Sequence, residues 1–442
     1  MDNGLGTRTE PTAVYRWVVL LFLSLAMFGN YYIYDAINPL VDIFAKQLGF
    51  SDENIGWLNS SYSVAAVLTL LIGGIIIDKI GTKKSMTVFA FICLVGALLT
   101  AWRGSFTTMV IGRAILGLGA ESLIVAVTTA LAKWFKGKEL SFAFGINLTI
   151  ARLASVAADN SPTWAGSVFY PEGSAGPASW QGPLMLAVGA GVLGVAAAVA
   201  YWGMEKTAEK RFTLGKAGEV DRLETKQIFR FSKSYWFIVG LCITFYSAIF
   251  PFRTFAIKFF MDTHFGGVAE DLARGSAGFF NSLLPMSAMI ATPLFGLLVD
   301  KVGKRALFMM VGSILLMPVY LIMAYTDITL WVPVSMMGIA FSLIPAVMWP
   351  SVAYIVDQRR LGTAYALMTL IQQVGFFALN LMIGMANDSS GAGAQNPGGY
   401  ALGMWLFSIL GFVGLAFAFL LRKSETGPGA HGLETIVAKS GA

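Results

Sequence analysis

The sequence has few charged residues, two cysteines and two histidines. Only 13% of its 442 residues are Asp, Glu, Lys or Arg, whereas soluble domains average about 25%. Cys93 and Cys242 lie inside apolar runs, so we expect neither a disulfide framework nor a cysteine metal cluster. His264 and His431 lie outside those runs, which excludes a histidine proton relay within them. No nucleophile–base pair or metal-ligand spacing is visible, so we expect no cofactor, no metal and no enzymatic activity.

Long apolar runs are abundant instead, and 56% of the residues are hydrophobic. A transmembrane helix needs about 17–25 mainly apolar residues. Twelve runs meet this criterion, near residues 15–36, 54–77, 85–102, 106–134, 139–166, 182–203, 234–260, 274–299, 305–325, 328–356, 361–387 and 400–421. The first run is long and lacks a following cleavage site, so no signal peptide is expected. The sequence therefore predicts an all-α membrane protein with twelve transmembrane helices.

The longest polar segment, residues 205–233, divides these runs into two sets of six. We expect two six-helix bundles, residues 1–204 and 234–422, a cytoplasmic linker over 205–233 and a cytoplasmic tail over 423–442. With the amino terminus inside, 24 of the 31 Lys and Arg residues fall on the cytoplasmic side, as the positive-inside rule requires. The net charge of +6 thus indicates topology and not a nucleic-acid partner, and both termini are expected in the cytoplasm of a multi-pass protein.

An internal repeat marks the end of the second run in each half. The first copy contains Gly74, Asp78, Lys79, Gly81 and Lys84, and the second contains Gly296, Asp300, Lys301, Gly303 and Arg305. The two copies are 222 residues apart, which is half the chain. The glycines permit close packing and a sharp turn. An ordinary basic loop would explain the lysines but not the duplication.

Two charges stand in the middle of the fourth and fifth runs. Glu121 lies 13 positions before Trp134, and Arg152 lies 14 positions after Lys138. At about 1.5 Å per residue, both are roughly 20 Å from the same membrane surface. Buried charges in membrane spans are costly and usually functional. The pair either ties two helices together or binds opposite charges on a ligand, and the polar face formed by Thr149, Arg152, Ser155 and Asp159 favours a wet cavity.

Other polar and aromatic side chains extend this candidate site. They are Tyr31, Tyr34 and Asp35 in the first run, Tyr246, Phe250 and Arg253 in the seventh, Asn281 in the eighth, Trp349 in the tenth, and Gln372 and Gln373 in the eleventh. Several have simpler interpretations: the tyrosines suit an interfacial aromatic belt, the amides suit helix packing, and Arg253 with Lys258 could snorkel to the outer surface. Asp35 beside the tyrosines favours a cavity lining or an outer gate. Trp349 suits an inner gate or an interfacial anchor.

The chemistry of these residues favours a zwitterionic ligand. Only one cation, Arg152, is central, whereas phosphate or nitrate would need paired cations. A plain sugar would not need both Glu121 and Arg152. The ammonium of a zwitterion would bind Glu121 and its carboxylate Arg152, while amide side chains suit peptide groups because they both donate and accept.

The duplicated glycine–aspartate motif resembles the signature loop of the major facilitator superfamily. Arg113, Gly117 and Gly119 are similar to that superfamily's RxxxGxG pattern in its fourth helix. The resemblance covers the whole chain and implies two rocking bundles with a ligand site near the midplane. It also implies that Asp78 and Asp300 latch the cytoplasmic side when the outer side is open.

A narrower resemblance rests on four stretches. The segment from Gly119 to Arg152, FYSAIFPF (245–252), FGLLVDKVGK (295–304) and MWPSVAYIVDQRRLGTAYALM (348–368) look like the lysosomal dipeptide-transporter branch. That branch implies dipeptide uniport, with Glu121 and Arg152 recognising the ligand's two ends. We expect a monomeric bacterial relative in the cytoplasmic membrane, without the lysosomal accessory subunit. A proton-coupled carrier of a carboxylate, amino acid or drug, and a non-transporting receptor, remain the alternatives.

Overall fold

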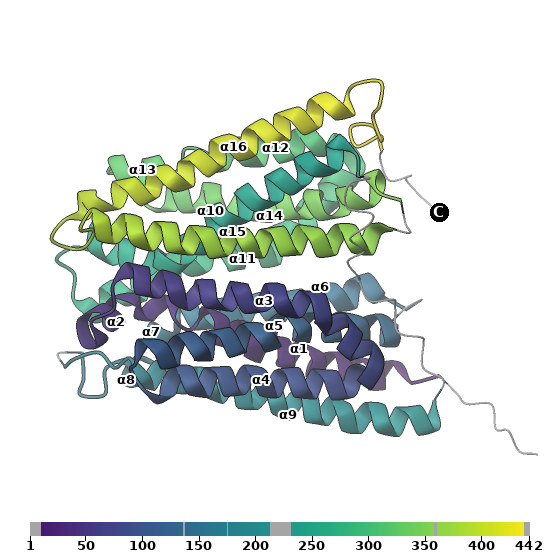
Figure 1. The fold of residues 1–442 in the computed structure, drawn as a ribbon, viewed down its shortest axis with the longest axis horizontal. Coiled ribbons are helices and arrows are strands. Elements are labelled where there is room, and N and C mark those ends of the chain that lie inside the picture. Colours follow the sequence, from purple (N-terminus) through teal and green to yellow (C-terminus); the bar gives the residue numbers. More distant parts are fainter. Residues whose placement is uncertain (1–9, 136–137, 175, 213–230, 358–359, 437–442) are drawn as a thin grey trace, which may run out of the picture.

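The computed structural model describes residues 10–135, 138–174, 176–212, 231–357 and 360–436. Within these ranges the regular elements are helices, and they run side by side along the long axis of the molecule (Figure 1). The first half contains α1 (Ala13–Asp35), η1 (Asn38–Leu40), α2 (Val41–Leu48), α3 (Asp52–Ile80), α4 (Thr82–Trp102), α5 (Phe106–Phe135), α6 (Leu140–Asp159), α7 (Ser161–Trp164), α8 (Gly166–Phe169) and α9 (Gln181–Arg211). The second half contains α10 (Lys233–Thr263), α11 (Glu270–Val302), α12 (Arg305–Leu316), α13 (Val319–Tyr325), α14 (Trp331–Ile355), α15 (Leu361–Ser389), η4 (Pro397–Tyr400) and α16 (Ala401–Glu425).

The predicted membrane spans are confirmed. Eleven helical stretches of the described chain are long and apolar enough to cross a bilayer, and α3 supplies a twelfth if its two segments, which meet at 54°, count as one span. Two boundaries were wrong. The fifth span ends at Asp159, because a proline-containing short helix, α7, follows it. The sixth continues to Arg211, so residues 205–211 are helical, whereas residues 213–230 of the predicted linker lie outside the described part.

The two halves form two bundles, with α1–α9 below and α10–α16 above in Figure 1. They meet mainly where α3 packs on α15 and where α6 packs on α11. We call the end that holds the start of α1 and the end of α16 the terminal face. The opposite end, which holds α2, α7 and α8, is the distal face (Figure 1).

The repeated motif forms the same turn in both bundles. Gly81 ends α3 with φ of 80°, and Gly303 ends α11 with φ of 72°. This left-handed conformation strains other residues, so the predicted need for glycine is confirmed. Asp300 and Arg305 form an ion pair of 2.6 Å within the second bundle. The latch role predicted for Asp78 and Asp300 remains a prediction.

Candidate functional site

Glu121 lies in the middle of α5 and contacts both bundles. Its position depends on Gly117, where an added Cβ would lie 2.3 Å from the carbonyl oxygen of Tyr62, so α3 approaches closely. The hydroxyl of Tyr62 donates to Glu121 Oε1 at 3.0 Å, and Gln373 Nε2 of α15 donates to the same oxygen at 2.9 Å. Glu121 Oε2 has no hydrogen-bond partner in the described part of the chain and is not buried. One carboxylate oxygen is therefore fixed and the other is available.

Arg152 of α6 is held by aromatic rings and not by a carboxylate. Its guanidinium carbon lies 5.7 Å from the ring centre of Tyr31 and 5.4 Å from that of Phe341. Such cation–π contacts orient a guanidinium without neutralising it. Among the described residues none accepts a hydrogen bond from its nitrogens, and these nitrogens are not buried. Glu121 and Arg152 do not pair with each other in this conformation, so the reading of them as a helix-tying ion pair is wrong here.

Aromatic side chains of the second bundle continue from Arg152. Phe341 lies 6.0 Å from Phe250, and Phe250 lies 5.9 Å from Tyr246, measured between ring centres. Trp349 Nε1 donates to the Tyr246 hydroxyl at 2.8 Å. The predicted residues Tyr246, Phe250 and Trp349 thus form one connected aromatic wall.

Tyr62 and Phe341 contact the charged site but are not among the residues predicted from the sequence. Both lie in apolar runs, where an aromatic residue that faces the cavity has the same sequence signal as one that faces lipid.

Asp35 and Arg253 lie in a buried ion-pair cluster between the bundles, and their predicted role in ligand binding remains a prediction. Arg253 donates to Asp35 at 3.3 Å and to Asp159 at 2.7 Å, and all three side chains are at most 3% exposed. Asn38 and Asn281 also donate to Asp159, at 3.1 and 3.0 Å. Arg253, Asp35 and Asp159 are therefore already paired with one another across the bundles in this conformation, whereas Arg253 Nε and Asn281 Oδ1 are buried without a hydrogen-bond partner among the described residues. We call these five residues the deep latch, and the snorkelling alternative for Arg253 is wrong.

Further ion pairs join the two bundles between the deep latch and the distal end of the molecule. Lys258 pairs with Asp52 at 2.6 Å, so it does not snorkel to the surface either. Lys46 pairs with Glu270 at 2.9 Å. Arg274, which is fully buried, donates to Asp42 at 2.8 Å. Each of these pairs joins one bundle to the other, so the distal half of the molecule is shut.

The terminal half holds a cleft between the bundles. It has a volume of about 300 Å³, and its lining includes Ser122, Thr69 and Thr129 of the first bundle and Thr369 of the second. Ser122 follows Glu121 directly, and Thr129 lies two turns closer to the terminal face along α5. The cleft therefore extends along α5 from near the depth of Glu121 toward the terminal face, and Glu121 itself is not among its lining residues.

Three predicted residues have structural partners of their own. Arg113 donates to Asn59 at 2.6 Å and lies 5.2 Å from the Tyr34 ring centre. Tyr34 in turn packs edge-on against Tyr62. Gln372 points toward the Cys242 thiol, with 3.9 Å between Oε1 and Sγ, while its neighbour Gln373 reaches Glu121. Of the two glutamines, only the second meets the charged site.

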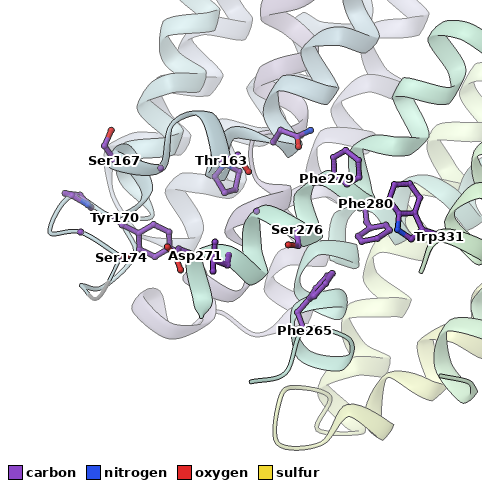
Figure 2. Close-up of a pocket in the computed structure, with 17 residues that line it drawn as sticks. Thr163, Ser167, Tyr170, Ser174, Phe265, Asp271, Ser276, Phe279, Phe280 and Trp331 are labelled. Atoms are coloured by element: carbon purple, nitrogen blue, oxygen red, sulfur yellow. The ribbon is translucent and has the colours of Figure 1, made fainter. Parts of the chain in front are cut away.

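A groove of about 940 Å³ lies on the distal face, apart from this site. Figure 2 shows Thr163, Ser167 and Tyr170 on one wall and Phe279, Phe280 and Trp331 on the other. Close packing separates it from the interior, because an added Cβ at Gly278 would lie 2.1 Å from the Asp159 carbonyl oxygen. No cluster of three potential metal ligands occurs among the residues that the structure describes.

Comparisons with known proteins agree with this architecture. A family model described as Major Facilitator Superfamily matches residues 23–380. The lysosomal dipeptide transporter MFSD1 of Danio rerio is 32% identical over 385 residues, which cover 86% of this chain and 82% of that protein. The human protein of the same name is 31% identical over 384 residues, covering 85% and 81%.

Solved structures show the same fold at lower identity. A bacterial homologue of the human lysosomal transporter Spinster, in an inward-facing and unoccupied conformation, matches with a TM-score of 0.72 and 17% identity, covering 94% of this chain and 98% of that one. PepTSo2 matches with a TM-score of 0.69 and 15% identity, covering 92% and 98%. The predicted fold of two six-helix bundles is thereby confirmed.

Proposed function

This chain belongs to the major facilitator superfamily, and we propose that it carries dipeptides across a membrane by uniport. In this proposal Glu121 binds the ammonium end of the peptide and Arg152 binds the carboxylate end. One observation carries it: an acid and a base on neighbouring helices do not pair with each other, and each keeps accessible atoms. The similarity to relatives named as dipeptide transporters supports the same substrate class.

The site is suited to a zwitterion because it holds one unpaired negative charge, on Glu121, and one unpaired positive charge, on Arg152. Hydrogen bonds to charged groups contribute about 1.5–3 kcal/mol each, so loss of either end contact should weaken binding about ten- to hundredfold. The aromatic wall from Phe341 to Trp349 offers apolar surface for peptide side chains of varied shape. A dipeptide fits this arrangement better than an anion, which would leave Glu121 in contact with like charge.

The conformation supports transport by alternating access. The distal face is shut by inter-bundle ion pairs, and the cleft leads inward from the terminal face. Since most Lys and Arg residues lie toward the terminal face in the predicted topology, we propose that this face is cytoplasmic and that the protein lies in the cytoplasmic membrane. The structure then corresponds to an inward-open carrier.

Uniport is favoured by the positions of the histidines. His264 follows α10, and burial lowers the pKa of its imidazole, which favours the neutral form. His431 lies beyond α16 and contacts Glu425. Neither histidine contacts the charged site, and the buried carboxylates of the deep latch already share Arg253.

The test is dipeptide uptake into liposomes that contain purified protein. Wild type should take up alanyl-alanine without acidifying the lumen, while Glu121→Gln and Arg152→Gln should each lower uptake at least tenfold. Arg103→Gln is the matched control, because Arg103 is an exposed charge outside the site. The function fails if no dipeptide raises the melting temperature of the wild type while another solute class does, and uniport fails if dipeptide drives acidification.

A further inference from the structure

Gln373 is buried and has one amide atom without a protein partner. The side chain is 3% exposed, and its Nε2 donates to Glu121 across the bundle interface. Its Oε1 is buried and accepts no hydrogen bond from the part of the chain that the structure describes. A buried acceptor without a partner is energetically unfavourable, so an unsatisfied carbonyl beside the charged site points to a ligand.

The orientation of this amide is fixed by chemistry. A carboxylate only accepts hydrogen bonds, so the nitrogen of Gln373 must face Glu121 and its oxygen must face away. The shared hydrogen bond uses Nε2 of Gln373 and Oε1 of Glu121. The second polar atom of each planar group, Oε1 of Gln373 and Oε2 of Glu121, has no hydrogen-bond partner among the described residues. Two unused acceptors therefore flank one inter-bundle contact, one from each bundle.

This contact lies at the edge of the closed part of the interface. Along α15, the next inter-bundle hydrogen bond joins the Phe377 carbonyl to Ser60, one turn closer to the distal face. In the other direction, Thr369 is one turn from Gln373 and already lines the terminal cleft. A ligand that enters through the cleft thus meets Glu121 and Gln373 where the bundles first touch.

We propose that the Gln373 carbonyl and Glu121 Oε2 together bind the ligand's ammonium group, so that the ligand bridges the two bundles through one nitrogen. This inference rests on the proposed dipeptide function and deepens it. An ammonium donates up to three hydrogen bonds; Glu121 supplies the charge and Gln373 a neutral acceptor. Because the Gln373 oxygen is shielded in this conformation, the ligand reaches it only when the bundles shift, which links capture to bundle motion.

The arrangement predicts selectivity for a free primary amine. N,N-dimethylation keeps the positive charge but leaves one N–H, so the modified peptide can bind Glu121 or Gln373 but not both. A hydrogen bond that involves a charged group changes affinity about ten- to hundredfold. Wild type should therefore bind alanyl-alanine at least tenfold more tightly than N,N-dimethyl-alanyl-alanine.

Three variants of the full-length protein test the role of the amide oxygen by calorimetric binding of both peptides. Gln373→Met keeps the size but removes the acceptor, and the selectivity ratio should fall about tenfold. Gln373→Glu removes the amide nitrogen but keeps an acceptor, and the ratio should stay near that of the wild type. Val374→Ala, at an exposed position next in sequence, should behave like wild type.

The outcomes separate this inference from the function on which it rests. If wild type binds no dipeptide, both fall. If wild type binds dipeptides but Gln373→Met retains the selectivity ratio, only this inference falls. If Gln373→Met and Gln373→Glu weaken both peptides equally, Gln373 merely orients Glu121 through its nitrogen, which also overturns the inference. A melting temperature within a few degrees of wild type confirms that the variants fold.

Discussion

Replacement of Arg253 by glutamine should open the distal face. Arg253 is the only cation in the deep latch and contacts both Asp35 and Asp159 across the bundle interface. Its removal leaves two buried carboxylates without their cation. Opening of the distal face would let water solvate them, so the variant should shift the equilibrium from the distal-closed toward the distal-open state.

The size of this shift follows from the burial of the pair. The side chains of Arg253, Asp35 and Asp159 are 2%, 3% and 0% exposed. Removal of one partner from a buried ion pair costs about 3–5 kcal/mol. We take the lower end, because Asn38 and Asn281 still donate to Asp159. At about 1.4 kcal/mol per factor of ten, the ratio of distal-open to distal-closed protein should rise roughly hundredfold.

Cysteine labelling at Ser60 measures this ratio. Ser60 is fully buried between α3 and α15 and donates to the Phe377 carbonyl, so a cysteine there reacts only when the distal face opens. The native Cys93 and Cys242 are both buried, which keeps the background low. The labelling rate of Ser60→Cys should rise at least tenfold when Arg253→Gln is added.

Two further variants control this experiment. Arg103→Gln removes an exposed charge and should leave the labelling rate unchanged. Asp35→Asn with Asp159→Asn, added to Arg253→Gln, removes the buried charges and should bring the rate back toward that of the parent. An unchanged rate in a folded Arg253→Gln protein would refute the assignment of this cluster as a latch.

Two more predictions concern packing and buried charge. Gly278→Val should prevent distal closure and raise Ser60→Cys labelling, because even a Cβ at this position would meet the Asp159 carbonyl oxygen. Gly296→Val is the control and should not raise labelling, because the space around Gly296 is open. Equal labelling in both variants would contradict the packing argument. Lys133→Met should lower the melting temperature by several degrees. The reason is that Glu205 is 1% exposed and Lys133 is its ion-pair partner at 2.7 Å. A melting temperature equal to that of wild type would show that Glu205 does not depend on this lysine.

Local sequence patterns were enough to predict the fold and to predict a common depth for Glu121 and Arg152. Twelve apolar runs and the polar segment 205–233 between the sixth and seventh predicted two sets of six helices, because hydrophobic length is a local property. The spacing of Glu121 and Arg152 from their common turn placed both near the middle of the membrane, since helical rise is constant. One acid, Glu121, and one base, Arg152, at a common predicted depth then indicated a zwitterionic ligand.

The contacts between polar residues depend on how the helices pack in three dimensions. Arg253 pairs with Asp35, 218 positions away, and with Asp159, 94 positions away. Sequence periodicity gave the depth and face of each residue but not the neighbouring helix that it would contact. For that reason periodicity could not predict that Asp35, Arg253 and Asn281, three candidate ligand-binding residues, contact one cluster between the bundles.

Tertiary packing also determines whether Glu121 and Arg152 pair with each other. Whether Glu121 and Arg152 neutralise each other depends on competing partners, and those partners are Tyr62, Gln373, Tyr31 and Phe341 from four other helices. Hydroxyl, amide and aromatic groups orient the charges without cancelling them. The sequence placed an acid and a base at one depth, and the packing of two bundles keeps them apart.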